Sequence, residues 1–238
     1  QNVKFKKKEY TIINPAFPAI ALLISGGHTE LVLMKDWFVY KIIGETKDDA
    51  VGEAFDKVAR ILGLPYPGGP EISRLSEKTR LELRSKSYEV SKKTEREIKL
   101  PRPMLKSDDL NFSFSGLKTA VLYLAKNLGK LSDNNKKNIA REFEDAVTEV
   151  LTVKTKKALV QFGAKTLIIG GGVSANKNIR NTFEKLATEK TDLKLFISTQ
   201  ELATDNALMI AFAGLLRLKA NKAKLGEKIT AQGNLKIM

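Results

Sequence analysis

The sequence contains no cysteine and only one histidine, His28, among its 238 residues. The absence of cysteine excludes disulfides, thiolate metal ligands and cysteine nucleophiles within the chain. With a single histidine, no histidine cluster can hold a metal, and a Ser–His–Asp triad would have to use His28. No apolar run approaches the roughly 20 residues of a membrane helix, and the first ten residues lack a signal-peptide core. We therefore expect a cytoplasmic protein that is not embedded in a membrane.

Acidic residues are in the minority, because 41 Lys and Arg stand against 27 Asp and Glu, which gives a net charge of +14. Such a surplus favours polyanionic partners, for example nucleic acids or acidic membrane surfaces. A lysine-rich composition that serves only solubility explains the same number. Hydrophobic residues make up 42% of the chain, which is ordinary for a globular protein and sufficient for a sizeable core.

The apolar pattern predicts an α/β chain with a defined order of elements. Buried or alternating apolar runs predict strands at residues 19–25, 28–34, 38–43, 166–169 and 193–198. Helical spacing of apolar residues predicts helices at residues 48–62, 117–128, 138–162, 177–187 and 204–218. Because single helices separate the last strands, these strands should pair in parallel through right-handed crossovers.

Local signals predict how two of these elements begin and end. Gly26-Gly27 should form a hairpin turn, because glycine adopts positive φ at little cost. The helix at 48–62 should be capped by Asp48 or Asp49 and should stop at Gly63.

Residues 71–106 carry eleven Lys and Arg against six Glu. The segment has helical propensity but a poor apolar stripe, which favours a solvated, basic helical insertion. It is a candidate surface for a polyanion, and a surface helix with no partner fits the same pattern. If it binds nucleic acid, replacing Lys92 and Lys93 with glutamate should weaken binding and flatten its salt dependence.

Two glycine-rich turns each follow a predicted buried strand, SGGH at 25–28 and GGGVSAN at 170–176. Glycine allows the backbone to approach a phosphate and to turn its N–H groups toward the anion. Each turn alone is a common structural feature, but ligands collect at the carboxyl ends of strands in such sheets. The second turn opens into a helix, which favours phosphate or ribose near Asn176. Neither turn matches GxxxxGK[ST] or GxGxxG.

Two sets of charged side chains leave alternatives open. Glu53, Asp56 and Lys57 share one helix face, where they could orient a polar ligand or form an exposed ion-pair surface. Asp205 lies at the start of the last predicted helix, where an aspartate is normally a cap and could also be a metal ligand.

Several long segments, taken together, resemble one family. They are Phe17-Pro18 with ALLISGGHTELVLM, DDAVGEAFDKVARILGLPYPGGP at 48–70, LPRPM at 100–104, NFSFSGLKTAV at 111–121, GGGVSANKNIR at 170–180 and ATDNALMIAFAG at 203–214. From about Phe17 to Leu218 the chain resembles the TsaD family, the bacterial tRNA N6-adenosine threonylcarbamoyltransferases. The resemblance implies two actin-like (RNase H-like) lobes around a nucleotide and metal cleft.

The same resemblance implies a domain organisation. Residues 17–220 would form the second actin-like lobe, a mixed sheet flanked by helices, with the basic helical insertion at about 71–106. Residues 1–16 would be a linker or a remnant of the first lobe, and 221–238 a C-terminal tail. Nearly the whole first lobe is expected to be missing, so the chain would be a fragment, a remnant or a split product that pairs with a separate N-terminal half.

The implied reaction transfers a threonylcarbamoyl group from threonylcarbamoyl-adenylate to N6 of adenosine 37 in tRNAs that read ANN codons, and releases AMP. No catalytic residue is assigned. The adenylate ligands implied by the resemblance are Leu23, Ile24, Ser25, Gly26, Gly27, Asp56, Gly69 and Asn176. Asp205 matches a carboxylate ligand of one divalent metal, iron (or zinc), which would polarise the carbamoyl carbonyl. The family's two further ligands, histidines in an HxxxH pattern, are absent from this chain.

The resemblance also implies partners: tRNA held on the basic surface, a paralogous actin-like subunit and a P-loop ATPase of the same modification complex. The missing histidines keep a second interpretation open, a non-catalytic actin-like nucleotide-binding scaffold subunit. A sugar or acetate kinase of the same fold class is a third, which the NFSFSGLKTAV and DAVGEAFDK segments disfavour.

Overall fold

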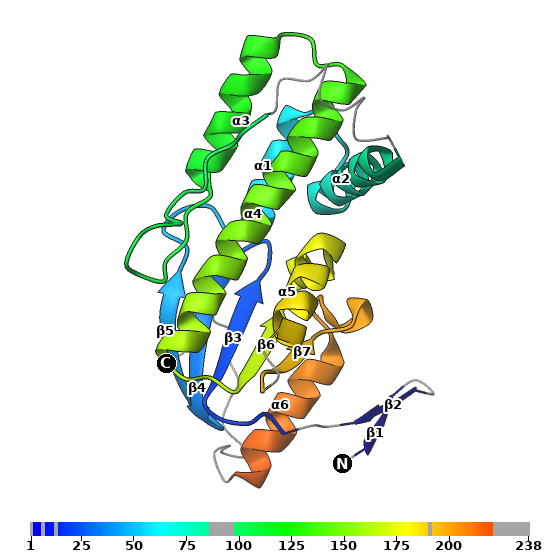
Figure 1. Cartoon of the computed structure of the whole chain (residues 1–238). Helices are drawn as coiled ribbons and strands as arrows, with labels where there is room; N and C mark the ends of the chain where they lie inside the picture. Colours follow the sequence, from blue (N-terminus) through cyan, green and yellow to red (C-terminus); the bar gives the residue numbers. More distant parts are fainter. Residues whose placement is uncertain (1, 6–7, 12–13, 86–97, 190–191, 221–238) are drawn as a thin grey trace, which may run out of the picture.

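The computed structural model describes residues 2–5, 8–11, 14–85, 98–189 and 192–220 (Figure 1). Its main feature is a five-stranded sheet of order β5-β4-β3-β6-β7. The strands are β3 (Ala19–Ile24), β4 (Thr29–Asp36), β5 (Val39–Glu45), β6 (Thr166–Gly170) and β7 (Lys194–Ile197). Each lies close to the bounds that the apolar pattern predicts.

Strand β3 lies at the centre of the sheet and joins its two halves. It pairs antiparallel with β4, with Leu22 opposite Leu31, and parallel with β6, with Leu22 opposite Ile169. β6 pairs parallel with β7, as the intervening helix predicts. The fold is therefore α/β with a mixed sheet, and the carboxyl ends of β3, β6 and β7 meet at one edge.

Helices flank this sheet, and some of them, including the long α4, extend beyond its carboxyl edge (Figure 1). They are α1 (Val51–Ile61), α2 (Gly68–Ser85), α3 (Ser115–Leu128), α4 (Asp133–Gln161), α5 (Lys177–Glu189) and α6 (Ala207–Lys219), with short 3-10 segments η1 (Gly172–Ala175) and η2 (Gln200–Leu202). α4 begins before the predicted Asn138, because the Ser132 side chain caps it by accepting a hydrogen bond from the Asn135 N–H at 3.2 Å. None of the described helices is both long and apolar enough to cross a membrane.

The long helix α4 organises the core. Its Phe143 and Val147 are fully buried, and they belong to one apolar cluster with Leu22 of β3 and Leu31 of β4. Phe143 also meets Phe55 of α1 edge to face, with ring centroids 5.1 Å apart. This contact fixes α1 against α4, and α1 forms part of the site described below.

The predicted N-cap of α1 is wrong, because Ala50 occupies that position without a side-chain cap bond. Asp48 instead accepts hydrogen bonds from the Ser113 and Ser115 hydroxyls at 2.6 and 2.5 Å and from the Phe114 N–H at 2.8 Å. These donors come from a loop far along the chain and hold Asp48 away from the helix start. The predicted stop is confirmed, since Gly63 follows α1 with φ at 67°.

The predicted reason for the Gly26-Gly27 turn is also wrong, although the hairpin itself forms. Neither glycine has a φ in the left-handed region. The turn is closed instead by a hydrogen bond from the Ser25 N–H to the His28 carbonyl at 2.9 Å.

Residues 71–85, the first part of the predicted insertion, are the body of α2 and pack against α4. Ile72 and Thr79 are buried on that face, and the Arg80 side chain reaches across to Glu144 at 2.5 Å. Residues 86–97, which include Lys92 and Lys93, lie outside the described residues, as does the predicted tail at 221–238. Near the start of the chain, β1 (Asn2–Phe5) and β2 (Lys8–Thr11) form a separate antiparallel pair.

Candidate functional site

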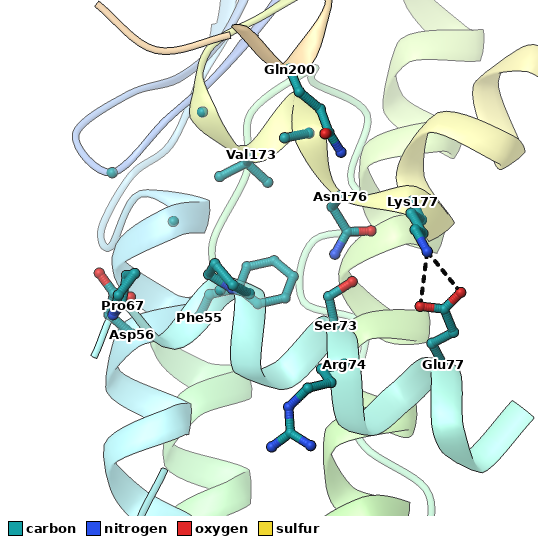
Figure 2. Close-up of a pocket in the computed structure, with 16 residues that line it drawn as sticks. Phe55, Asp56, Pro67, Ser73, Arg74, Glu77, Val173, Asn176, Lys177 and Gln200 are labelled. Carbon is teal, nitrogen blue, oxygen red and sulfur yellow. Dashed lines mark hydrogen bonds and ion pairs between the residues drawn. The ribbon is translucent and has the colours of Figure 1, made fainter. Parts of the chain in front are cut away.

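A cavity of about 450 Å³ opens at the carboxyl edge of the sheet (Figure 2). Gly26 after β3, Val173 after β6 and Gln200 after β7 line one side of it. Phe55 of α1 and Ser73 of α2 line the other side. This is the edge at which ligands bind in open α/β sheets.

Two glycines allow the backbone segments beside the cavity to come together. The Gly52 N–H donates to the Ser25 carbonyl at 3.1 Å, and a Cβ at position 52 would lie 2.7 Å from the same oxygen. Gly171 has φ at 94°, and a Cβ there would lie 2.3 Å from the Ile24 carbonyl oxygen. Glycine is therefore required at both positions, because α1 and the turn after β6 each touch the end of β3.

Three helices begin at the cavity. Gly52 lies in the first turn of α1, Gly69 in the first turn of α2, and Lys177 begins α5, and all three residues line the cavity. Helix N-termini carry unpaired N–H groups and a partial positive charge, which together favour anions. The cavity is therefore suited to a ligand that carries a phosphate or carboxylate.

Four of the eight ligand residues expected from the resemblance line this cavity, namely Gly26, Asp56, Gly69 and Asn176. The other four lie in β3 and its turn and are not among the lining residues. Ile24 is buried in the core on the α4 side, while Leu23 packs on the opposite face of the sheet. Successive residues of a strand point to opposite faces, so these two side chains cannot both face one ligand.

The two remaining turn residues are engaged with each other. The Ser25 hydroxyl oxygen accepts hydrogen bonds from the Gly27 and His28 N–H groups at 3.2 and 3.0 Å. Ser25 therefore shapes the turn that brings Gly26 to the cavity.

Asp56 links α1 to the start of α2. One of its carboxylate oxygens accepts a hydrogen bond from the Gly68 N–H at 2.8 Å. The next residue, Gly69, has no atom within 4 Å of the position its Cβ would occupy, so this part of the cavity is open. Asp56 thus positions the N-terminus of α2 as well as lining the cavity.

Asn176 precedes α5, and both the oxygen and the nitrogen of its side-chain amide are hydrogen-bonded. Its Oδ1 accepts a hydrogen bond from the Ile179 N–H at 3.0 Å, and its Nδ2 donates to Glu144 at 2.6 Å. Glu144 is fully buried and also accepts from Arg80 at 2.5 Å. Burial raises the pKa of Glu144 above its ordinary value, against the opposing effect of the Arg80 and Asn176 hydrogen bonds.

An ion pair lies at the edge of the cavity between α2 and α5. Lys177 Nζ lies 3.0 and 3.1 Å from the two carboxylate oxygens of Glu77 (Figure 2). Sequence reasoning missed both residues as site residues, along with Ser73 and Gln200, because no local pattern distinguishes them. Phe55 lies in the predicted helix at residues 48–62, where apolar spacing indicates a core position and gives no sign of a binding role.

On the same helix as Asp56, the charged residues form an ion-pair surface. Lys57 Nζ lies 2.8 Å from both Asp49 and Glu53. Of the two alternatives for this face, the geometry favours the ion pair, because both partners of Lys57 are side chains of this segment.

Asp205 is not among the residues that line the cavity and occupies an exposed position before α6. The cap of α6 is the neighbouring Asn206, whose Oδ1 accepts a hydrogen bond from the Met209 N–H at 2.9 Å. Among the described residues, no group of three or more His, Cys, Asp or Glu side chains is placed to hold a metal ion. The side chains around Asp205 therefore do not complete a metal site by themselves.

The sequence from residue 5 to residue 212 matches the family described as TsaD, tRNA N6-adenosine threonylcarbamoyltransferase. The chain belongs to the TsaD family. This confirms the resemblance seen in the motifs, and the mixed sheet with its flanking helices is consistent with the actin-like fold of TsaD. The family's description makes it a family of transferases that modify tRNA.

Curated relatives carry the same name, tRNA N6-adenosine threonylcarbamoyltransferase. The relative from Herminiimonas arsenicoxydans is 50% identical over 208 residues, which cover 87% of this chain and 56% of the relative. The relative from Paraburkholderia xenovorans is 48% identical over 207 residues, with 86% and 56% covered. The relative from Wigglesworthia glossinidia brevipalpis is 43% identical over 210 residues, with 88% and 57% covered. This chain thus spans little more than half the length of these relatives.

Proposed function

We propose that the cavity binds the adenylate part of threonylcarbamoyl-adenylate, and that this chain forms the nucleotide-binding part of a tRNA N6-adenosine threonylcarbamoyltransferase. One observation carries the proposal. Gly26, Asp56, Gly69 and Asn176 come from distant parts of the sequence, and the fold brings them around one cavity. Three helix N-termini at the same cavity support a phosphate as part of the ligand.

In the proposed reaction, the N6 amine of adenosine 37 in tRNAs reading ANN codons attacks the carbamoyl carbon of the bound adenylate. A C–N bond forms, the bond from that carbon to the phosphate oxygen breaks, and the amine loses a proton as AMP leaves. The partial positive charge at the starts of α1, α2 and α5 would attract the phosphate and stabilise its increasing negative charge, while the Gly52 and Gly68 N–H groups stay bonded to Ser25 and Asp56.

Iron (or zinc) in the family's metal centre would use Asp205 as one ligand. The described residues do not supply the rest, and the chain's only histidine, His28, lies in the β3–β4 turn. Completing such a centre requires ligands from another segment or polypeptide, so none of the steps above is assigned to the metal.

Nucleotide binding tests the first part of the proposal. Isothermal titration should show AMP binding to the chain, and Gly69→Leu should weaken it by at least about tenfold, because the new side chain projects into open cavity. Gly214→Leu is the matched control, since position 214 of α6 is equally open and lies away from the cavity. Equal AMP affinity of the two variants would contradict this ligand site.

Group transfer tests the second part. The chain is incubated with threonylcarbamoyl-adenylate and an ANN-decoding tRNA, with and without an N-terminal half of a relative, and modified adenosine is measured by mass spectrometry. Product only when the half is added supports a split enzyme. No product in either reaction, with AMP binding retained, favours the non-catalytic scaffold, which the incomplete metal ligand set around Asp205 also favours.

The remaining partners follow from the same proposal. tRNA would bind through phosphate contacts to the basic surface of a chain with net charge +14, which predicts affinity that falls with salt. A paralogous actin-like subunit and a P-loop ATPase would complete the modification complex, in the cytoplasm. Residues 17–220 would form the second lobe in that assembly. Lys92 and Lys93 remain predicted tRNA contacts.

A further inference from the structure

Glu144 contacts residues of both walls of the cavity, although it does not line the cavity itself. It lies in the middle of α4, and its side chain has no exposed surface. One carboxylate oxygen accepts from Asn176 at 2.6 Å and the other from Arg80 of α2 at 2.5 Å. Ser73, which lines the cavity on the α2 side, also acts on Glu144 and lowers the pKa of its carboxyl, against the effect of burial. Figure 2 shows Ser73 and Asn176 lying toward each other from the two walls.

These contacts leave Asn176 only one orientation. Its Oδ1 accepts from the Ile179 N–H, and its Nδ2 donates to a carboxylate, which can only accept. A rotated amide would place Oδ1 against the Glu144 carboxylate and Nδ2 against a backbone donor, and both contacts would be repulsive. One N–H of Nδ2 and the second lone pair of Oδ1 remain for other partners, and the fixed orientation of the amide decides where that N–H is offered.

We infer that Glu144 is a positioning residue of the nucleotide site: it fixes the Asn176 amide so that the cavity receives an N–H donor directed at an acceptor atom of the ligand. The inference rests on the proposed function for the identity of the ligand, a nucleotide. It also specifies the ligand chemistry that this N–H recognises, an acceptor such as a hydroxyl oxygen, a ring nitrogen or a phosphate oxygen.

The neighbouring Asp145 provides a control for this role. It pairs with the same arginine, through Arg80 Nη2, and lies 3.6 Å from Arg141, but no bond of its side chain reaches Asn176. Asp145→Asn therefore removes a carboxylate partner of Arg80 while leaving Asn176 in place. Glu144→Gln removes the charge beneath Asn176 and adds a donor that can compete with Nδ2.

The experiment measures AMP affinity and the side-chain amide resonances of the full chain. In 1H–15N spectra the Asn176 pair is identified by its loss in Asn176→Ala. We expect Glu144→Gln to shift that pair and to weaken AMP binding about tenfold, while Asp145→Asn changes neither by more than about twofold. In the Asn176→Ala background, Glu144→Gln should cause no further loss of AMP affinity, although it should still lower the unfolding temperature.

The outcomes separate the inference from the function on which it rests. An unshifted Asn176 resonance in Glu144→Gln, or a further tenfold loss in the Asn176→Ala background, would overturn the positioning role. If the unsubstituted chain binds no AMP, the proposed function fails, and the resonance shift alone then decides whether Glu144 orients Asn176. Should Glu144→Gln not fold, Glu144→Asp keeps the charge but shortens the reach to Asn176, and the same two readouts apply.

Discussion

Individual polar residues in this TsaD chain take partners that lie far away in the sequence. Asp48 is the clearest case, since its carboxylate receives the Ser113 and Ser115 hydroxyls and the Phe114 N–H. The Ser115 N–H adds a fourth hydrogen bond at 3.2 Å, and together the four outweigh the effect of partial burial, so the pKa of Asp48 lies below its ordinary value. Asp48 thus ties the end of β5 to the start of α3.

The lowered pKa makes a prediction for stability against pH. A carboxylate whose pKa is lower in the folded state stabilises the fold above its ordinary pKa of about 4, and that contribution disappears as the pH falls through the folded-state value. In Asp48→Asn this part of the loss of stability in acid should vanish. At pH 7 the substitution should lower the free energy of unfolding by about 1 kcal/mol, because the site is exposed and its charge is screened. Urea unfolding at pH 7 and pH 3 measures both quantities. An unchanged pH dependence in the variant would show that Asp48 does not contribute.

At the scale of elements, close backbone contacts decide which glycines matter. Position 171 requires glycine for two reasons: its φ is left-handed, and a Cβ there would collide with the end of β3. Neither reason applies to the adjacent Gly172. The sequence shows three consecutive glycines and does not distinguish them. Only the packing of the turn after β6 against Ile24 separates their roles.

We expect Gly171→Ala to destabilise the fold by about 1–3 kcal/mol from backbone strain alone, and to weaken AMP binding because the turn must move. Gly172→Ala should change stability by less than about 1 kcal/mol, since a Cβ there meets no atom within 4 Å. Thermal unfolding and AMP titration of the two variants provide the comparison. Equal stability of the neighbours would contradict the close approach to Ile24.

At the scale of the whole molecule, one apolar cluster connects the sheet, the long helix α4 and the cavity. Phe55 belongs to both the core and the cavity wall. Its edge-to-face contact with Phe143 joins α1 to α4. Packing in the core therefore sets the shape of the site. A substitution in α4 should therefore change the affinity for the ligand even though the substituted residue does not contact the ligand.

Phe143→Leu tests this connection. It should cost about 1–2 kcal/mol of stability and also weaken AMP binding, because Phe55 loses the ring that holds it. Phe183→Leu in α5 is equally buried and should cost a similar amount of stability with little effect on AMP. If both variants bind AMP like the unsubstituted chain, the cavity wall does not depend on the core contact.

The amino-acid sequence by itself determined the five strands of the main sheet, most helices, the positions of the glycine turns and the family. These features depend on apolar periodicity and on residues a few positions apart, so they can be read locally. The metal ligand expected at Asp205 stays a prediction.

The tertiary structure alone decided which residues share the cavity, why Asp48 is not a helix cap, and how Asn176 is oriented. Asp48 and Ser113 are 65 positions apart, and Asn176 and Glu144 are 32 apart. Such contacts exist only after α1, α4 and the sheet have packed, because hydrogen bonding at that separation depends on the positions of whole elements. No pattern within a single segment specifies those positions.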